Sequence, residues 1–503
     1  MDDISNLVNA DNKVEVLSTL GKIAQNTYYL TVAEMGTRIL GFILVILIAR
    51  HLGDIAFGQY SFVLAFVSLF AVIADIGLSS LSTRTIAQKP DHFDEYIGNI
   101  FTIKLILSLV VLALIVIVVL TSNYSQDVSF AIYIAAIYTI FTSLKDLFIS
   151  VIRGVQEMKL EMQIKIFEKT LLFALIFALI FLNCSLIGIL FAYAISSSCA
   201  YIYSYFTSKR FYRLHINFNI VFWKTVILEA LPFAITTVLV TVYFQIDTIM
   251  LSMMKGDAIV GWYNAAYKII FALMFIPGAF VSAIFPVISQ HYASNLMEST
   301  KKLFILGIKY LILIAIPITV FGYIFASEII FLLYGESFTP SVYAFQILVF
   351  VVPLLFVTSL LGSTLQALGA QRMVCIIAGI NAVINITLNF VIIPYYSYIG
   401  ASITTVLTEL FGVIAMIFYS TRILNIQPLK IGMLRYISVI SIFSLTTWVL
   451  ASFNCIVAFT VGFVVYMTLL CTHKILDDQD KAIVEKLFKE GHIYRFFRAV
   501  HII

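Results

Sequence analysis

Ionisable side chains interrupt long apolar stretches of this sequence, and five of them are best placed to do chemistry: Glu34, Arg38, Asp247, Lys268 and Glu409. A charged side chain inside an apolar segment costs roughly 2.5–3.5 kcal/mol on insertion scales, so it normally faces a partner or a water-filled cavity. Arginine and lysine in a site of low dielectric would bind a phosphate group. These residues are therefore the candidate binding and coupling residues.

Structural roles compete with this interpretation. Glu34 and Arg38 are four residues apart and share one helical face, so they would either neutralise each other or form a charged cavity wall. Asp247 and Lys268 are expected at comparable depth on neighbouring helices. They would form an ion pair, or Lys268 would be a second cavity cation beside Arg38. Glu409 has no evident partner and is, with Glu34, a candidate coupling residue.

Other motifs that carry chemistry are missing from the sequence. It contains no GxxxxGK[ST] phosphate loop, no HExxH and no GxSxG, and its five cysteines share no close spacing. We therefore expect no catalytic residues, no metal and no cofactor.

The composition determines which elements must position these charges. Of the 503 residues, 61% are hydrophobic and 12% are charged, against roughly 25% charged residues in a soluble domain. This excludes a soluble enzyme and a nucleic-acid binder. Since one membrane crossing takes about 20 apolar residues, we predict an all-α polytopic membrane protein with about 14 transmembrane helices. The predicted spans are 28–50, 57–79, 99–121, 128–150, 166–183, 185–207, 226–252, 262–289, 303–325, 341–366, 373–394, 398–420, 433–451 and 454–473.

An internal repeat divides these spans into lobes. The motif Gly-Asp-x-x-x-Gly-x-Tyr occurs at 53–60 and again at 256–263, each time on the turn between the first and second helices of a six-helix set. Six crossings separate the copies, so both have the same orientation, which predicts two parallel six-helix lobes plus two C-terminal helices. The predicted organisation is an amphipathic cytoplasmic or interfacial segment (1–27), an N-terminal lobe (28–207), a cytoplasmic linker (208–225), a C-terminal lobe (226–420), two extra transmembrane helices (433–473) and a cytoplasmic amphipathic tail (474–503).

Lysine and arginine set the orientation. Of the 31 such residues, 27 lie on the side of the termini, in loops or in the adjoining ends of spans. Only Arg50 and Lys255 fall at the opposite ends, and Arg38 and Lys268 fall deeper within spans. The positive-inside rule therefore predicts a multi-pass protein of the cell membrane with both termini in the cytoplasm. The predicted outer loops are too short for a folded catalytic domain.

Three stretches of the sequence resemble a known family. They are residues 52–60 with 73–78, residues 247–251 with 260–268 and 285–286, and residues 365–367 with 385–402. In this order they resemble the oligosaccharide flippases of the multidrug/oligosaccharidyl-lipid/polysaccharide exporter superfamily, over nearly the whole chain.

The resemblance implies alternating access around a central cavity. It implies a polyprenyl-phosphate- or pyrophosphate-linked oligosaccharide as substrate, moved from the cytoplasmic to the outer leaflet, with membrane lipids and glycosyltransferases or a polymerase of the same pathway as partners. It also implies cavity cations at Arg38 and Lys268, next to Glu34 and Asp247. One alternative is a cation-coupled antiporter for drugs or organic cations, with an acidic cavity. Another is a membrane-embedded glycan polymerase or ligase.

Overall fold

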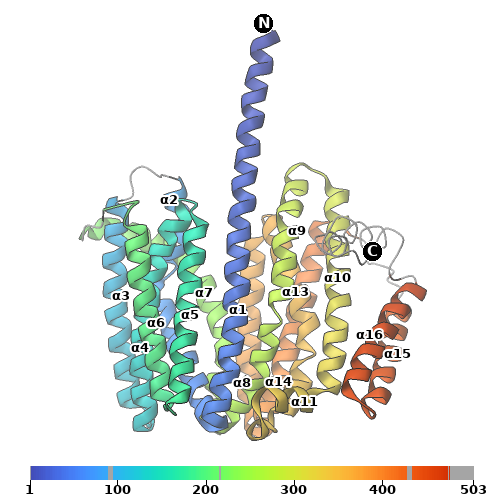
Figure 1. Cartoon of the computed structure of the whole chain (residues 1–503). Coiled ribbons are helices and arrows are strands. Elements are labelled where there is room, and N and C mark those ends of the chain that lie inside the picture. The colour runs from blue at the N-terminus through green and yellow to red at the C-terminus, as the bar shows by residue number, and fades with distance from the viewer. Residues whose placement is uncertain (1, 89–93, 214–216, 427–432, 474, 476–503) are drawn as a thin grey trace, which may run out of the picture.

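The structure is a computed structural model of the chain, and it describes residues 2–88, 94–213, 217–426, 433–473 and 475. These residues form α-helices, turns and one short 3-10 helix, and no strand occurs among them (Figure 1). Helices satisfy their backbone hydrogen bonds internally, which lipid requires of any spanning segment. The structure confirms the predicted all-α polytopic membrane fold.

The first half of the chain forms six crossings. α1 supplies two of them because it breaks at Gly53, whose φ of 73° suits glycine. α2 continues the second crossing after a turn at Ile76 and Gly77. The helices of this half are α1 (Asp2–Asp75), α2 (Leu78–Gln88), α3 (Asp94–Thr121), α4 (Gln126–Gly154), α5 (Met158–Phe181) and α6 (Leu186–Ser208).

The second half repeats this plan with more interruptions. α8 and α9 together form one crossing, α12 and α13 form another with a bend of 43°, and α14 breaks at Ser397 into two crossings. The helices are α7 (Ile220–Lys255), α8 (Asp257–Ala272), α9 (Phe275–Ala293), α10 (Met297–Ile324), α11 (Ala326–Tyr334), the 3-10 helix (Glu336–Phe338), α12 (Ser341–Leu348), α13 (Val351–Ala367) and α14 (Gln371–Ile423).

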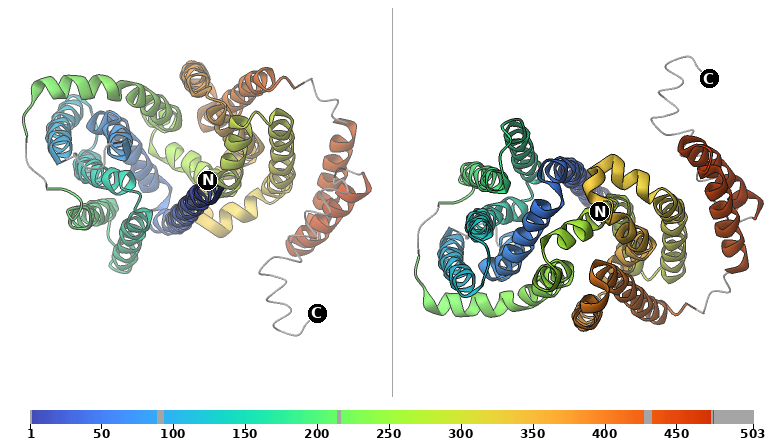
Figure 2. Two further views of the ribbon diagram at one scale, coloured as in Figure 1. Left: turned by 90° about the horizontal axis from the view of Figure 1, so that it is seen from above. Right: turned by 90° about the horizontal axis from the view of Figure 1, so that it is seen from below.

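Two further helices, α15 (Met433–Ala451) and α16 (Cys455–Thr472), form a hairpin outside both lobes (Figure 2). The hairpin packs on α10 through an aromatic cluster of Phe321, Phe443 and Tyr466. It therefore borders the second lobe only.

The described helices account for fourteen crossings, as predicted. Nine helices are long and apolar enough to span a membrane, or ten if the bent pair of α12 and α13 is one span. Two of the nine are of double length, Tyr28–Gln88 and Gln371–Ile423. The shorter α15 and the more polar α5 complete the set.

The predicted terminal segments differ in what the structure describes. From Asp2 onward the segment 1–27 is the beginning of α1, which projects well beyond the other helices (Figure 1). The predicted tail at 474–503 lies, except for Ile475, outside the described residues. α1 thus enters the membrane without a break in the helix.

Candidate functional site

A cavity of about 350 Å³ lies between the two lobes, with α1 as one wall and α9 as the other. Its polar lining consists of Thr31, Glu34 and Arg38 from α1 and Ser282 from α9. Apart from one glycine, the remaining lining is apolar. Such a mixed lining suits a ligand that combines a polar group with an apolar chain.

Arg38 keeps its hydrogen-bond donors available in this cavity. Its Nε lies 3.8 Å from the Glu34 carboxylate, too far for a hydrogen bond, and no closer partner occurs among the residues that the structure describes. Glu34 is bound instead by the Lys165 ammonium at 2.6 Å. The Arg38 side chain is 46% exposed. The predicted Glu34–Arg38 pair therefore exists only as a loose contact.

Lys268 is a membrane-embedded cation for which no counter-ion occurs among the described residues. α8 begins at Asp257, five residues before the predicted start of this span, so Lys268 lies about 17 Å from the start of α8 by helical rise. Arg38 lies about 22 Å inside Gly53 by the same measure. Within the described ranges no ion pair or hydrogen bond reaches the Lys268 ammonium. The two cations thus come from opposite lobes and lie at similar depth, but Lys268 is not among the residues that line the cavity with Arg38.

Asp247 is buried within the second lobe and is bound by neutral groups. Its carboxylate accepts hydrogen bonds from the Tyr263 hydroxyl at 2.7 Å, the Thr405 hydroxyl at 3.1 Å and the Asn389 amide at 2.5 Å. Lys268 is not one of these partners. The alternative of an Asp247–Lys268 ion pair therefore does not hold in this structure.

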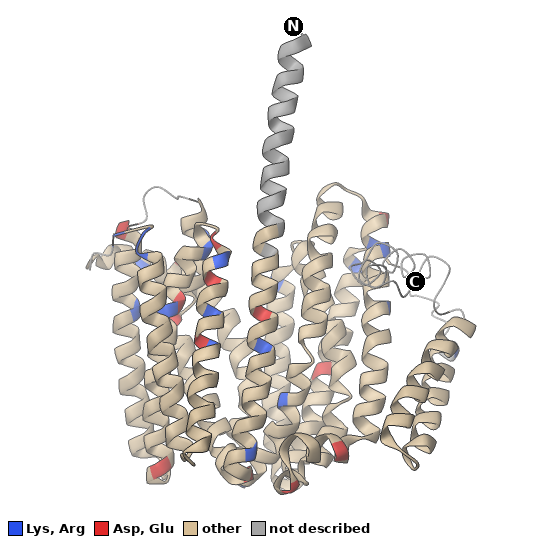
Figure 3. Ribbon diagram, viewed as in Figure 1, with Lys and Arg blue, Asp and Glu red and all other residues tan. Residues whose placement is uncertain are grey.

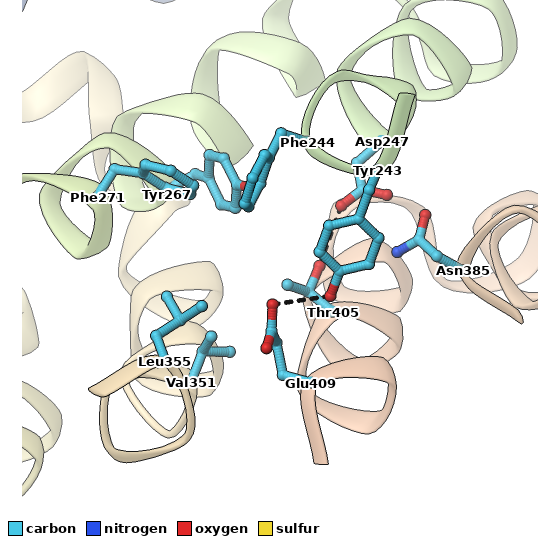
Figure 4. A pocket seen from close by; sticks show the side chains of 10 residues that line it. All are labelled: Tyr243, Phe244, Asp247, Tyr267, Phe271, Val351, Leu355, Asn385, Thr405 and Glu409. Atoms are coloured by element: carbon cyan, nitrogen blue, oxygen red, sulfur yellow. Dashed lines mark hydrogen bonds between the residues drawn. The ribbon is translucent and has the colours of Figure 1, made fainter. Parts of the chain in front are cut away.

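A small chamber connects Asp247 with Glu409 (Figure 4). Its volume is about 10 Å³, and Tyr243 donates a hydrogen bond to the Glu409 carboxylate at 2.8 Å across one side. Beside it, the side-chain oxygen of Asn389 finds no hydrogen-bond partner in the part of the chain that the structure describes. Carboxylate, amide and hydroxyl oxygens are ligands that hard cations prefer. The chamber could therefore hold a proton or a small hard cation.

The sequence analysis did not assign the neutral partners of these carboxylates. Tyr243, Tyr263 and Thr405 are polar residues that resemble ordinary members of apolar helices. The asparagines carried a usable signal, because Asn381, Asn385 and Asn389 recur every four residues and so share one face of α14. Three amides on one face of a membrane helix predict a polar contact inside the lobe.

The two copies of the repeat meet at the end of the molecule that the sequence predicts to face outward. Gly53 and Gly256 have nearly the same backbone conformation, with φ of 73° and 91° and ψ of 178° and 175°. Just beyond these glycines, hydrogen bonds link the copies in both directions. Gln59 donates to the Asp257 carboxylate at 3.0 Å, and the Trp262 indole donates to the Asp54 carboxylate at 2.9 Å.

Backbone contact accompanies these hydrogen bonds. A Cβ atom added at Gly58 would lie 1.8 Å from the Asp257 carbonyl oxygen, and one added at Gly261 would lie 2.1 Å from that of Asp54. Only glycine allows two helices to approach this closely. We name the contact of residues 53–60 with residues 256–263 the outer seal. It holds the two lobes in direct contact at this end.

Comparison with known proteins supports the same architecture. The chain is 23% identical over 416 residues to the "probable low-salt glycan biosynthesis flippase" of Haloferax volcanii, covering 80% of this chain and 85% of that protein. It is 23% identical over 418 residues to a capsular polysaccharide biosynthesis protein of Staphylococcus aureus, covering 80% and 100%. Among solved structures, the lipid II flippase MurJ in an inward closed conformation matches with a TM-score of 0.73 and 16% identity, covering 88% and 98%. At 16% identity, this last match shows a shared fold and nothing more.

Two family models also match the chain. The MatE model matches residues 232–391, which lie in the second lobe. The model described as polysaccharide biosynthesis protein matches residues 23–292, from the first crossing through α9. This match covers more than half of the sequence and includes both copies of the repeat. The chain therefore belongs to the polysaccharide biosynthesis protein family.

Proposed function

We propose that this protein moves a polyprenyl-phosphate- or pyrophosphate-linked oligosaccharide from the cytoplasmic to the outer leaflet by alternating access. The lobes at 28–207 and 226–420 would be the moving units. Membership of the polysaccharide biosynthesis family and relatives named as a glycan flippase and a capsular polysaccharide protein support this class of substrate. The fold, shared with a lipid II flippase, supports a transporter rather than an enzyme.

One observation carries the proposal. Arg38 and Lys268 come from opposite lobes, lie at similar depth, and lack hydrogen bonds to any described side chain or carbonyl. Two unsatisfied cations in a membrane are costly without an anionic ligand. A phosphate or pyrophosphate group would bind Arg38 in the cavity, and Lys268, which does not line the cavity in this structure, would join it after a movement of the lobes. The apolar surfaces of α1 and α9 would face the lipid chain.

The orientation follows from charge. Lysine and arginine gather in the half of the molecule from which α1 projects (Figure 3). We propose that this half faces the cytoplasm, that both termini lie there, and that the protein resides in the cell membrane. The outer seal then closes the cavity to the outside, so the substrate would enter from the cytoplasmic leaflet.

The small chamber between Asp247 and Glu409, here called the carboxylate chamber, is the proposed binding site of the ion that drives transport. We propose that Asp247 and Glu409 bind the coupling proton or cation, since both line one enclosed space inside the second lobe. Asp247 is thereby proposed as a coupling residue rather than a contact of the substrate. Glycosyltransferases or a polymerase of the same pathway are the proposed partners, because they would supply and consume the lipid-linked glycan.

The test is removal of either cation. Arg38→Ala and Lys268→Ala are each expected to lower glycan assembly at the cell surface by about 10- to 100-fold, because a charge-assisted hydrogen bond contributes about 1.5–3 kcal/mol. Cells that lack the native gene would carry each variant. Surface glycan and the amount of protein in the membrane fraction are then measured.

Two matched controls remove cations elsewhere. Lys255→Ala deletes a lysine that donates to the Pro394 carbonyl at the outer end, and Arg84→Ala deletes an exposed arginine of α2. Both are expected to retain glycan assembly. Normal assembly in Arg38→Ala and Lys268→Ala, at normal protein levels, would contradict the proposal.

The second candidate is a cation-coupled multidrug antiporter, which the match of residues 232–391 to the MatE model favours. Such a protein would need an acidic cavity, and here Lys165 offsets the one carboxylate of the cavity, Glu34. Gradient-driven efflux of an organic cation from vesicles, without any effect on glycan, would favour the antiporter.

A further inference from the structure

A chain of alternating charges runs from the end of α4 through α5 to the cavity. Arg153 donates to both oxygens of Glu161, at 2.6 and 2.7 Å. Lys165, one turn further along α5, lies 3.1 Å from Glu161 and 2.6 Å from Glu34 on α1. Arg38 ends the chain, 3.8 Å from Glu34.

Lys165 links its own helix, α5, to α1. Near the turn before α5, the Asn26 amide donates to the Gln156 carbonyl at 3.2 Å, which aligns this end of α5 with α1. From this level both helices run in the same direction, and Glu34 and Lys165 each lie about 10–12 Å further along by helical rise. Glu161 is fully buried, whereas Lys165 is 22% exposed and Glu34 is 50% exposed. From Glu161 onward the chain of charges thus becomes more accessible toward the cavity, whereas Arg153 at its other end is 43% exposed.

The distances show which of the two cations, Lys165 or Arg38, pairs more closely with Glu34. Attraction between charges falls with distance, so a carboxylate 2.6 Å from Lys165 and 3.8 Å from Arg38 is engaged mainly by the lysine. The chain holds three cations and two carboxylates, and its unmatched positive charge resides at the cavity end, on Arg38. Without Lys165, Glu34 could form the close pair with Arg38 that their i, i+4 spacing allows.

We propose that Lys165 is a positioning residue that holds Glu34 and thereby keeps the Arg38 guanidinium available for a phosphate or pyrophosphate group. The inference rests on the proposed function, in which Arg38 binds the anionic group of the substrate. Lys165 acts through Glu34 and does not itself touch the ligand.

The test measures the affinity of the purified full-length protein for inorganic pyrophosphate, alongside glycan assembly in cells. Lys165→Gln is expected to weaken pyrophosphate binding about tenfold, because Glu34 then competes for Arg38. The double variant Lys165→Gln/Glu34→Gln is expected to return to within about threefold of the wild-type affinity. Glu34→Gln alone is expected to tighten binding about two- to threefold. Lys165→Arg, which keeps the charge, should restore most of the binding and of the glycan assembly.

The outcomes separate this inference from the proposed function. A double variant as weak as Lys165→Gln alone would show a packing role for Lys165 and overturn the inference. Weakened binding in Glu34→Gln alone would also overturn it, and this arm needs no substitution at Lys165. If Arg38→Ala leaves the affinity unchanged, the phosphate site itself is wrong. If Arg38→Ala weakens binding while Lys165→Gln does not, only the positioning role is wrong.

Discussion

Single residues in this protein fall into two groups of membrane-embedded charge. Lys104 lies 2.6 Å from Asp75, and Lys145 lies 2.7 Å from Glu168, so these cations are neutralised within the first lobe. Such pairs are costly to break, since removal of one partner leaves a buried charge without compensation. Arg38 belongs to the other group, with its guanidinium in the inter-lobe cavity beyond hydrogen-bond range of a carboxylate. The contrast supports the proposal that its charge serves a ligand.

Asp247 allows a test of coupling at this scale. Asp247→Asn removes the charge but keeps the shape of the side chain, so gradient-driven flipping is expected to fall about 10- to 100-fold. The measurement is flipping of a labelled lipid-linked oligosaccharide in vesicles under imposed sodium or proton gradients. Asp127→Asn, at an exposed position of α4, is the matched control. Undiminished gradient dependence in Asp247→Asn would contradict the coupling role.

At the scale of helices, the Gly-Asp repeat gives α1 and the α7–α8 turn the same local structure. α1 and the α7–α8 turn each present a glycine with positive φ, an aspartate, and a second glycine one turn later. The aspartate of each copy accepts a hydrogen bond from the other copy, so the outer seal is reciprocal. Because small residues determine how closely the helices approach, the seal depends on Gly58 and Gly261 more than on the hydrogen bonds.

The outer seal predicts that two glycines of α1, Gly58 and Gly41, differ in how well they tolerate replacement by alanine. Gly58→Ala places a methyl group 1.8 Å from the Asp257 carbonyl oxygen, and overpacking of this kind costs about 1–3 kcal/mol. We expect flipping to fall about tenfold or more, because the lobes can no longer close at the outer end. Gly41→Ala, also in α1, meets no atom within 4 Å and is expected to flip normally. Equal activity of the two variants, at equal membrane levels, would remove the basis for the seal as a moving contact.

At the scale of the molecule, the two lobes meet at the outer seal and enclose a cavity between α1 and α9. The carboxylate chamber is enclosed by the second lobe alone, and α15 and α16 lie outside both lobes (Figure 2). Alternating access would therefore separate the copies of the repeat while each lobe keeps its own buried polar contacts.

This movement can be blocked chemically. In a chain whose five free cysteines have been replaced, Gln59→Cys with Asp257→Cys places two thiols at positions whose side chains are hydrogen-bonded across the lobes. Cross-linking is expected to stop flipping, and reduction of the disulfide is expected to restore it. Each single cysteine variant, treated with the same oxidant, serves as the control. Continued flipping by fully cross-linked protein would show that the outer seal does not open.

The sequence by itself determined the class of fold and much of its plan. Lipid admits only segments that satisfy their own backbone, so apolar length predicts helices and their number. The Gly-Asp repeat indicated two lobes in the same orientation, and the charges within apolar spans identified Arg38 and Lys268. The predicted start of α8 lies five residues too late, because Asp257 and Gly261 reduce the apolar signal at its beginning.

Only the tertiary structure decided which partner each charge has. Glu34 appeared to belong to Arg38 because the two are neighbours on one helix, yet Lys165, 131 residues away, binds it more closely. Asp247 appeared to belong to Lys268, yet its partners Asn389 and Thr405 come from α14, 142 and 158 residues further along. The physical reason is that a partner on another helix depends on how the two helices are rotated and how closely they pack, which local periodicity does not encode.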